Sequence, residues 1–553
     1  MNFTQELKPI FTGDIDTTDA TLKKYSHDAS IFDIRPQVVL YPRTAEDIKN
    51  LVTWVNQNKT AHPELSITSR CAGTDMSGGS INESIILDFT RYMNKLIDFS
   101  TEQAITVEPG MFYRDFEKLT LQKNMILPCY TASKSLNAMG GMFGNNSAGE
   151  RTLQYGKTED YILETKVIFA DGREYTVKPL TKKELYAKIA QGDFEGDVYK
   201  NIYALIQENK DELAKAKPNV TKNSAGYYLW NVWDAEKEIF DLNKVLCGSQ
   251  GTLGIATEIT FRLVRPKEFT NLVVVFMRDV SILPNIVNTI LPFKPQTMET
   301  YDDKTFLLVL KYIVSFIRLL GWNNFFRLVM SFGPETIMTL RHGFPRLVVL
   351  VEFTADTKAE ADTTTKGALK ALKKFKTIGV HKTRNEFEAK KYWTIRHEAF
   401  NLIRFHLKKM KSEAFVDDVI VRPEMLPQFY PALYEILGRY KSHMTFAVGG
   451  HAGDGNMHIY TLLDPHDPEL RNIVMDVSKK VYDLVISLGG SITAEHNDGI
   501  IRSPFLAQMF GEHIYSLFVA TKEIFDTKNI FNPGKKVGTT REYLESHITK
   551  PDA

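Results

Sequence analysis

Three glycine-rich loops constrain the fold of this chain most strongly. They span residues 69–80, 139–149 and 247–254, and each lies among runs that read as strands. Loops of small residues gather backbone N–H groups without obstruction by Cβ atoms, which is what a pyrophosphate requires. The first loop has neither the spacing of a P-loop nor that of a Rossmann fingerprint, so those two nucleotide folds are not supported. Any one loop could be an ordinary glycine-bearing turn, but three together predict a long ligand that is touched from several sides.

Length and composition narrow the class of protein. At 553 residues the chain exceeds the size of a single core, so two or three domains are expected. The 68 basic and 67 acidic residues nearly balance, which argues against nucleic acid as the main partner. Three widely spaced cysteines favour neither a disulfide framework nor an iron–sulfur cluster. The N-terminus lacks an apolar segment, so no signal peptide is expected and a cytoplasmic location is predicted.

The first local unit that the sequence predicts is a strand followed by a helix. Residues 37–41 read as a strand, and Thr44 then has the character of a helix N-cap. Four apolar side chains follow at helical spacing. They are Ile48, Leu51, Val52 and Val55.

A second feature bears on chemistry. His451 and His458 are separated by a segment with two glycines, an aspartate and an asparagine, which cannot sustain a helix. The flanking residues 444–448 and 457–462 read as strands, so both histidines should lie at the mouth of a strand–loop–strand unit. Glu495 and His496 follow in a second glycine-bounded turn. Two neutral imidazoles and one carboxylate, with a position left open, form the ligand set of a catalytic divalent metal site. Structural histidines with satisfied hydrogen bonds are the alternative.

Six motifs in order resemble those of the FAD-linked D-2-hydroxyacid dehydrogenases of the vanillyl-alcohol oxidase superfamily, a family that includes D-lactate dehydrogenase and the glycolate oxidase flavin subunit. The motifs lie at residues 68–79, 140–149, 248–255, 450–458, 495–499 and 532–535. The resemblance covers about residues 30–540. It implies an α+β fold, with a two-subdomain FAD-binding domain of PCMH type and a cap domain with an antiparallel sheet and flanking helices.

The resemblance also implies domain boundaries. An N-terminal extension would cover residues 1–29 and the FAD-binding domain residues 30–266. The cap or substrate domain would cover 267–505 with an apolar, basic insertion at 306–340, and a helical segment, 506–553, would return to the FAD domain.

By similarity, the three loops and one C-terminal residue would bind FAD. The first loop would cradle the pyrophosphate, the second would hold the flavin, the third would close the adenine end, and Asn532 would reach the isoalloxazine. The residues are Arg70, Gly73, Thr74, Ser77, Gly78, Gly141, Gly144, Asn145, Ser147, Gly251, Thr252, Ile255 and Asn532. Cys71 lies in the first loop, but non-covalent FAD is expected, as in most relatives.

The resemblance assigns the remaining site residues. His451, His458 and Glu495 would bind Zn²⁺ or a similar divalent ion. His496 would face the substrate hydroxyl as a base, Arg396 would bind the carboxylate, and Asn456 belongs to the same catalytic set. The implied activity is oxidation of a D-2-hydroxyacid by hydride transfer to flavin N5, assisted by the metal.

Two departures from the family pattern bear on substrate and turn shape. Dicarboxylate-specific relatives have a lysine where this chain has Val416, so a monocarboxylate such as D-lactate is favoured unless Lys411 or Arg422 reaches the site. Asn497 replaces the glycine that commonly follows the Glu-His pair. The alternatives are a D-2-hydroxyglutarate or glycolate dehydrogenase with a soluble acceptor, a metal-dependent hydrolase, and a flavin-bearing electron carrier without catalysis.

The insertion suggests a further partner. Residues 306–330 are mostly apolar, and Lys311, Ser315 and Arg318 would form a narrow polar stripe on a helix. Charges near the middle make it a poor transmembrane span and favour an interfacial helix. Peripheral attachment to the inner face of a membrane, with electrons passed to quinone, is the leading interpretation. A buried cap helix or an oligomer contact is the alternative.

Overall fold

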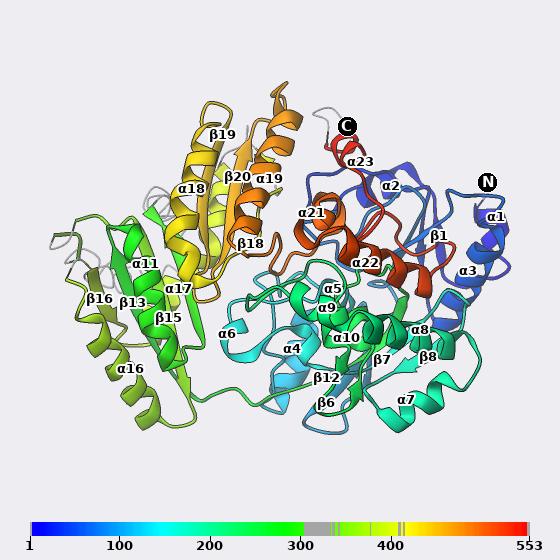
Figure 1. Cartoon of the computed structure of the whole chain (residues 1–553), viewed down its shortest axis with the longest axis horizontal. Coiled ribbons are helices and arrows are strands. Elements are labelled where there is room, and N and C mark those ends of the chain that lie inside the picture. Colours follow the sequence, from blue (N-terminus) through cyan, green and yellow to red (C-terminus); the bar gives the residue numbers. More distant parts are fainter. Residues whose placement is uncertain are drawn as a thin grey trace.

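The computed structural model describes residues 3–303, 333, 338–340, 343–376, 378–406, 411–412 and 415–549. The insertion predicted at 306–330 therefore lies outside the described residues. The molecule has two lobes (Figure 1). The cap strands and helices, drawn green to orange, form one lobe, and both ends of the chain lie in the other.

The N-terminal subdomain is a four-stranded sheet in the order β1-β2-β4-β3, with bounds Asp14–Asp16, Val38–Tyr41, Ile85–Asp88 and Ile67–Arg70. Strands β2, β4 and β3 are parallel, and β1 adds an antiparallel edge. Helix α3, Ala45–Asn58, begins after Thr44, and the capping box closes with Asp47. The predicted strand–helix unit is confirmed, because the four apolar side chains expected on one face of this helix are all buried.

The second subdomain is a five-stranded antiparallel sheet in the order β5-β6-β12-β7-β8, with bounds Leu96–Asp98, Ala104–Val107, Ile255–Arg262, Ile162–Ile168 and Glu174–Val177. Its core includes Leu517 and Phe518 of α22, Glu512–Phe525. Phe531 then forms a bridge with Ile67 of β3. The C-terminal segment therefore packs against both FAD-domain subdomains.

The cap is an antiparallel sheet with the path β16-β13-β15-β14-β19-β20-β17, and β18 also pairs with β20. The bounds are Ile378–Lys382, Phe269–Met277, Leu347–Ala355, Thr297–Asp302, Met444–His451, Asn456–Leu463, Lys411–Ser412 and, for β18, Val419–Ile420. This sheet, together with the FAD domain, confirms the predicted α+β class.

Successive side chains of the central cap strands point alternately into two hydrophobic cores, one on each face of the sheet, because the side-chain period of a strand is two residues. Val273, Val275 and Met277 of β13 face a core shared with α11, α16, α18 and α19. These helices span Leu283–Ile290, Lys358–Leu372, Leu426–Gly438 and Leu470–Ser487. The intervening Leu272, Val274 and Phe276 pack with Tyr392 and Ile395 of α17, Glu386–His406, on the other face. Helix α17 thus lies on the opposite side of the sheet.

The β19–β20 hairpin fixes the positions of His451 and His458 relative to each other. Gly449 pairs with His458 and His451 with Asn456, so the predicted strand–loop–strand unit is confirmed. Gly455 adopts a φ of +75°, and a Cβ there would lie 1.9 Å from the carbonyl oxygen of Val421. Only glycine fits that position, because both the backbone conformation and the neighbouring chain exclude a side chain.

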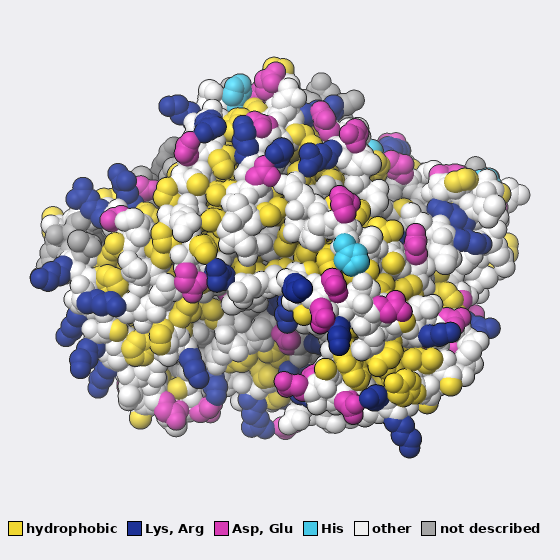
Figure 2. Space-filling view, in the orientation of Figure 1, with side chains coloured by type: hydrophobic (Ala, Val, Ile, Leu, Met, Phe, Trp, Pro, Cys, Tyr) yellow, Lys and Arg dark blue, Asp and Glu magenta, His cyan; other side chains and the backbone are white. Residues whose placement is uncertain are grey.

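The surface carries charges of both signs (Figure 2). Lysine and arginine side chains gather along the outer edge of the cap in this view. Lys358, Lys366 and Lys370 of α16 are exposed. Across the described ranges, no helix combines the length and the apolar character needed to cross a membrane.

Candidate active site

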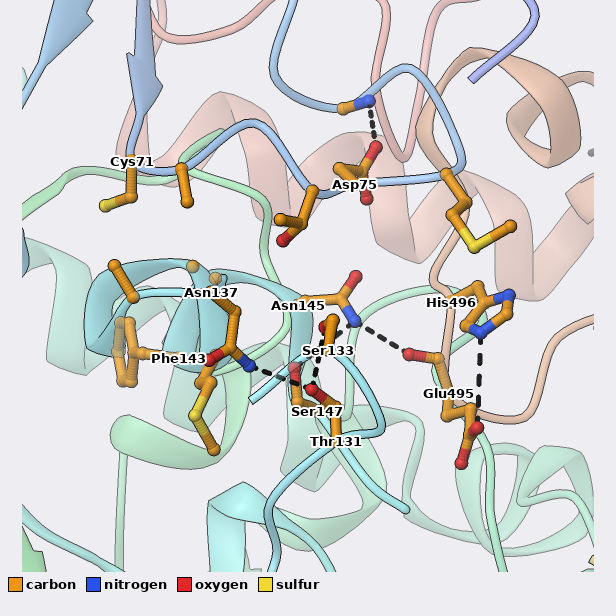
Figure 3. Close-up of a pocket in the computed structure, with 18 of the residues that line it drawn as sticks. Cys71, Asp75, Thr131, Ser133, Asn137, Phe143, Asn145, Ser147, Glu495 and His496 are labelled. Carbon is orange, nitrogen blue, oxygen red and sulfur yellow. Dashed lines mark hydrogen bonds and ion pairs between the residues drawn. The ribbon is translucent and has the colours of Figure 1, made fainter. Parts of the chain in front are cut away.

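A cavity of about 760 Å³ lies between the FAD-binding domain and the cap. All three glycine-rich loops contribute to its wall, and so do the cap residues Glu299 and Arg396 and the pair Glu495–His496. Cavities of this size are typical of cofactor sites. Figure 3 shows Asn145 and Ser147 of the second loop on the same side of the cavity as Glu495.

Helix α5, Met139–Asn145, offers a bare backbone surface to this cavity. An added Cβ would find no neighbour closer than 4.0 Å at Gly141 and 3.9 Å at Gly144, so protein packing does not require glycine at either position. Both residues line the cavity. The unfilled space is a cradle for a flat ligand that approaches the backbone closely, and a flavin fits it.

The structure places the predicted FAD residues in two groups. Eight line the cavity: Arg70, Gly73, Thr74, Gly141, Gly144, Asn145, Ser147 and Gly251. Ser77, Gly78, Thr252, Ile255 and Asn532 lie behind the wall.

Two of the predicted FAD residues have protein partners that suggest a supporting role. The Asn532 amide donates to the carbonyl oxygens of Gly79 and Gln250, at 2.8 and 2.7 Å, and so ties the first loop to the third. The guanidinium of Arg70 donates to the carbonyl oxygen of His27 at 2.7 Å. The direct flavin contacts assigned to Asn532 and Arg70 stay predictions.

The first loop contains two groups whose state sequence reasoning did not address. The Asp75 carboxylate accepts hydrogen bonds from the backbone N–H groups of Ser77 and Gly79, at 3.0 and 2.6 Å. Burial nevertheless raises the pKa of Asp75 to about 6. Burial also raises the pKa of the Cys71 thiol to about 12, so this thiol is protonated near neutral pH.

The three predicted metal ligands converge. His451 ends β19, His458 lies in β20, and Glu495 belongs to the segment that follows α19. Glu495 Oε1 lies 3.2 Å from Nε2 of each histidine. Two ligands bound tetrahedrally to a zinc ion would be separated by about 3.3 Å, so the spacing suits a shared divalent ion.

The hydrogen-bond partners of His458 also favour a cation at this point. Its Nδ1 lies 3.2 Å from the backbone carbonyl oxygen of Asp417, which can only accept, so Nδ1 carries the proton. Burial lowers the pKa of His458, which leaves Nε2 as a lone pair facing a Glu495 oxygen. The pKa of Glu495 is itself held low, because Lys222 and His451 outweigh the effect of burial. Two acceptors in contact repel each other unless a proton or a metal ion lies between them, and this donor set fits a divalent metal.

Glu299 and Arg396 support the cluster from the cap. The Glu299 carboxylate accepts from His451 Nδ1 at 2.5 Å and from Arg396 Nε at 3.1 Å. Burial alone would raise the pKa of Glu299, but these two partners lower it to about 2. Burial would lower the pKa of His451, and Glu299 instead raises it to about 9. A guanidinium has five N–H donors, so Arg396 has donors beyond those that bond to Glu299.

His496 lies beside the cluster and faces the cavity. Its ring stacks on that of His458, with centroids 5.1 Å apart, and its Nδ1 bonds to the Asp417 carboxylate. Nε2 lies 4.0 Å from Glu495 Oε1. Burial would lower the pKa of His496, but Asp417 and Asp418 raise it to about 9. A divalent ion at the adjacent cluster would lower this pKa again and favour the neutral imidazole.

The remaining predicted residues are structural neighbours of the site. Asn456 is buried behind the cavity wall, and its amide donates to Asp418 at 2.8 Å. Asn497 adopts a φ of +67°, a conformation that asparagine tolerates better than most residues. Its amide donates to the carbonyl oxygens of Asn145 and Gly248, both at 3.0 Å, so the turn keeps its shape without the usual glycine.

The structure shows several site residues that sequence reasoning missed: Lys222, Glu299, Asp417, Asp418, Tyr460 and Arg502. Most are acids and bases far apart in sequence, and no motif marked them. The pair Asp417–Asp418 directly follows Val416, but two adjacent aspartates without a recognised spacing do not mark a site.

Comparison with known families agrees with this geometry. Residues 36–178 match the family "FAD binding domain" and residues 266–536 match "FAD linked oxidases, C-terminal domain". The chain belongs to the FAD-linked oxidases. This FAD-linked oxidase has the fold of p-cresol methylhydroxylase, with a TM-score of 0.65 and 14% identity over 97% of this chain and 96% of that chain. Alkyldihydroxyacetonephosphate synthase gives 0.63 and 14% over 96% and 84%.

Curated relatives of the FAD-linked oxidase include several D-2-hydroxyacid enzymes. It is 25% identical to a D-2-hydroxyglutarate dehydrogenase from Escherichia coli strain K12, over 100% of this chain and 53% of that protein. It is 24% identical to glycolate oxidase subunit GlcD from Bacillus subtilis strain 168, over 94% and 93%, and 23% identical to a D-lactate dehydrogenase from Anaerostipes hadrus, over 94% and 93%. The chain spans about half the length of the Escherichia coli relative.

Proposed function

We propose that this FAD-linked oxidase oxidises a D-2-hydroxymonocarboxylate, with D-lactate to pyruvate as the leading reaction. The observation that carries the proposal is one cavity whose wall joins the flavin loops to Arg396, His496 and the cluster of His451, His458 and Glu495. A metal cluster alone would also suit a hydrolase, but a hydrolase would leave the glycine cradle of α5 unexplained.

Different residues of the chain would bind the substrate and accept its proton. Arg396 would bind the substrate carboxylate through guanidinium donors that Glu299 leaves free. His496 Nε2 would take the hydroxyl proton. When bound, FAD would accept the hydride and a divalent ion held by the cluster would acidify the hydroxyl.

Charge pairing in the cavity supports a monocarboxylate. Arg70, Lys134 and Arg396 are the lysine and arginine side chains that line it within the described part of the chain. Arg70 is bonded to backbone carbonyls, and Lys134 lies 2.8 Å from Glu117. Arg396 also pairs with Glu299, through Nε and Nη2, but its guanidinium has further donors, so it is the cation that we propose for the substrate carboxylate. A second carboxylate would have no partner there, and an unpaired buried charge is costly.

Two positions named from the sequence bear on the same question. Val416 is fully buried in the cap core, and Arg422 does not line the cavity. The Lys411 side chain lies outside the described residues. A D-2-hydroxyglutarate dehydrogenase is the second candidate, because several relatives carry that name. Glycolate is a third substrate, named through the glycolate oxidase relative.

An anaerobic flavin-bleaching screen tests the proposal. The purified protein should be yellow, and D-lactate should bleach its flavin absorbance faster than L-lactate, glycolate or D-2-hydroxyglutarate. Faster bleaching by D-2-hydroxyglutarate would replace the monocarboxylate with the second candidate. A yellow protein that no 2-hydroxyacid bleaches would exclude the proposed reaction.

A further inference from the structure

Asp417 contacts two histidines of the site through different groups. Its backbone carbonyl oxygen lies 3.2 Å from His458 Nδ1, and one oxygen of its carboxylate bonds to His496 Nδ1. The other carboxylate oxygen accepts from Arg502 Nη2 at 2.6 Å. Asp417 is 3% exposed and Arg502 is fully buried, so solvent does not weaken the pair.

These contacts decide which nitrogen of each ring carries a proton. A carbonyl or an ionised carboxylate can only accept, so both Nδ1 atoms must donate. Each Nε2 then lies on the side of Glu495 Oε1, at 3.2 Å for His458 and 4.0 Å for His496. Arg502 also donates to the carbonyl oxygen of Asn497 at 2.9 Å, which fixes the guanidinium beside Asp417. The pKa of Asp417 is held below its usual range, because Arg502 and His496 outweigh the effect of burial.

We propose that Asp417 is a positioning residue for the proposed oxidation, which holds His496 in the Nδ1–H tautomer with Nε2 toward the substrate hydroxyl. The inference rests on the proposed function. In the step concerned, the substrate O–H bond would break and an N–H bond would form at His496 Nε2, and FAD, when bound by the glycine-rich loops, would supply the acceptor for the hydride from the α-carbon. Asp417 stays ionised and stabilises the imidazolium that results.

The neighbouring Asp418 has a different task. One oxygen of its carboxylate accepts from the hydroxyl of Thr493 at 2.8 Å and from the backbone N–H groups of Glu495 and His496 at 2.8 and 2.9 Å. Those contacts shape the backbone turn that carries the Glu-His pair. The ring of His496 depends on Asp417 instead.

The variant Asp417→Asn tests the inference. Its amide nitrogen can donate to Nδ1 and favour the tautomer with the proton on Nε2. We expect the rate of flavin reduction at saturating D-lactate to fall by about 10² to 10⁴. Because Arg396 and the cluster are untouched, the substrate concentration for half-maximal rate should change by less than about threefold. FAD and zinc content should match the wild type. Asp417→Glu, which keeps an acceptor, should recover part of the rate.

Two further variants separate positioning from folding. In Asp417→Asn/Arg502→Met both charges of the buried pair are removed, so the loss of rate should persist without an uncompensated arginine. Glu388→Gln is the matched control, because Glu388 is 4% exposed, bonds to His381 Nε2 at 2.9 Å in the same domain and does not line the cavity. This control should reduce its flavin at the wild-type rate.

The outcomes are distinct. A wild-type rate in Asp417→Asn, or an equal loss in Glu388→Gln, overturns the positioning role. Loss of zinc or FAD from Asp417→Asn together with the rate assigns Asp417 a structural role and also overturns it. A wild type that no 2-hydroxyacid reduces refutes the proposed function itself.

Discussion

At the scale of single residues, the site consists of ion pairs that hold each acid against a base. Glu299 pairs with Arg396, Glu495 with Lys222 and Asp417 with Arg502, at 3.1, 3.0 and 2.6 Å. All six side chains are largely buried, so each charge is compensated inside the protein. Three features of the site are not used by these pairs. They are His496 Nε2, the Arg396 donors that do not bond to Glu299, and the space between the predicted metal ligands His451, His458 and Glu495.

Substitution of His496 should separate chemistry from cofactor binding. His496→Ala should lower the rate of flavin reduction by D-lactate by about 10² to 10⁴, because a general base is lost. FAD content, read from the absorbance spectrum, should be unchanged. Reduction near the wild-type rate would make His496 a structural residue.

Removal of a ligand should affect the metal before the flavin. His451→Ala and His458→Ala should each contain less zinc than the wild type by elemental analysis, and both should lose activity together with the metal. Prolonged dialysis of the wild type against a chelator should give the same loss, reversed by added Zn²⁺. A full metal complement in both variants would contradict the ligand assignment.

At the scale of elements, helix α5 and the β19–β20 hairpin supply two sides of the cavity. Helix α5 exposes a glycine surface to the cavity, whereas the hairpin register brings His451 and His458 together near the turn of the β19–β20 hairpin. Asn145, the last residue of α5, donates to the backbone carbonyl oxygen of Glu495 at 2.7 Å. This contact joins the flavin loop to the Glu-His pair.

A side chain added to the α5 surface should occupy the flavin cradle. Gly144→Val should reduce FAD affinity by about tenfold or more, because its methyl groups would enter space that the ligand needs, and overpacking of this kind costs about 1–3 kcal/mol. The melting temperature of the FAD-free protein should stay within a few degrees of the wild type, since the protein leaves room for a Cβ.

The control is Gly438→Ala. Gly438 is the last residue of α18, and no atom lies within 4 Å of an added Cβ there, so this variant should bind FAD normally. Normal FAD affinity in Gly144→Val would move the flavin away from α5.

At the scale of the whole molecule, two domains form one cavity, and the returning C-terminal segment supports its wall through Asn532. Lys222 of the FAD domain reaches Glu495 at 3.0 Å and Asp454 of the cap hairpin at 3.6 Å. The site therefore exists only when the two lobes are docked. The electron acceptor is a separate question, and membrane quinone stays our proposal from the sequence of residues 306–330, which the described structure does not include.

Flotation with anionic liposomes tests that proposal. Wild type should float, and Leu307→Glu/Ile313→Glu/Phe316→Glu should remain in the dense fraction while D-lactate still bleaches its flavin, because charges on an apolar interfacial face oppose insertion. A wild type that stays with the soluble fraction would favour a buried helix or an oligomer contact at 306–330.

The sequence by itself determined the features that depend on neighbours along the chain. The Thr44 cap, the apolar face of α3 and the strands around His451 and His458 follow from local periodicity and turn chemistry, and the structure contains all of them. The six ordered motifs also identified the family and its two-part fold, because glycine loops reflect backbone requirements that leave a readable pattern.

Only the tertiary structure decided which charges meet. Glu299 and His451 are 152 residues apart, and Lys222 and Glu495 are 273 apart, so no local pattern links them. It also separated the predicted cofactor residues that line the cavity from those, such as Asn532, that support the wall from behind. Such contacts depend on the docking of whole domains, and burial there sets the protonation of each group, which spacing along the chain cannot specify.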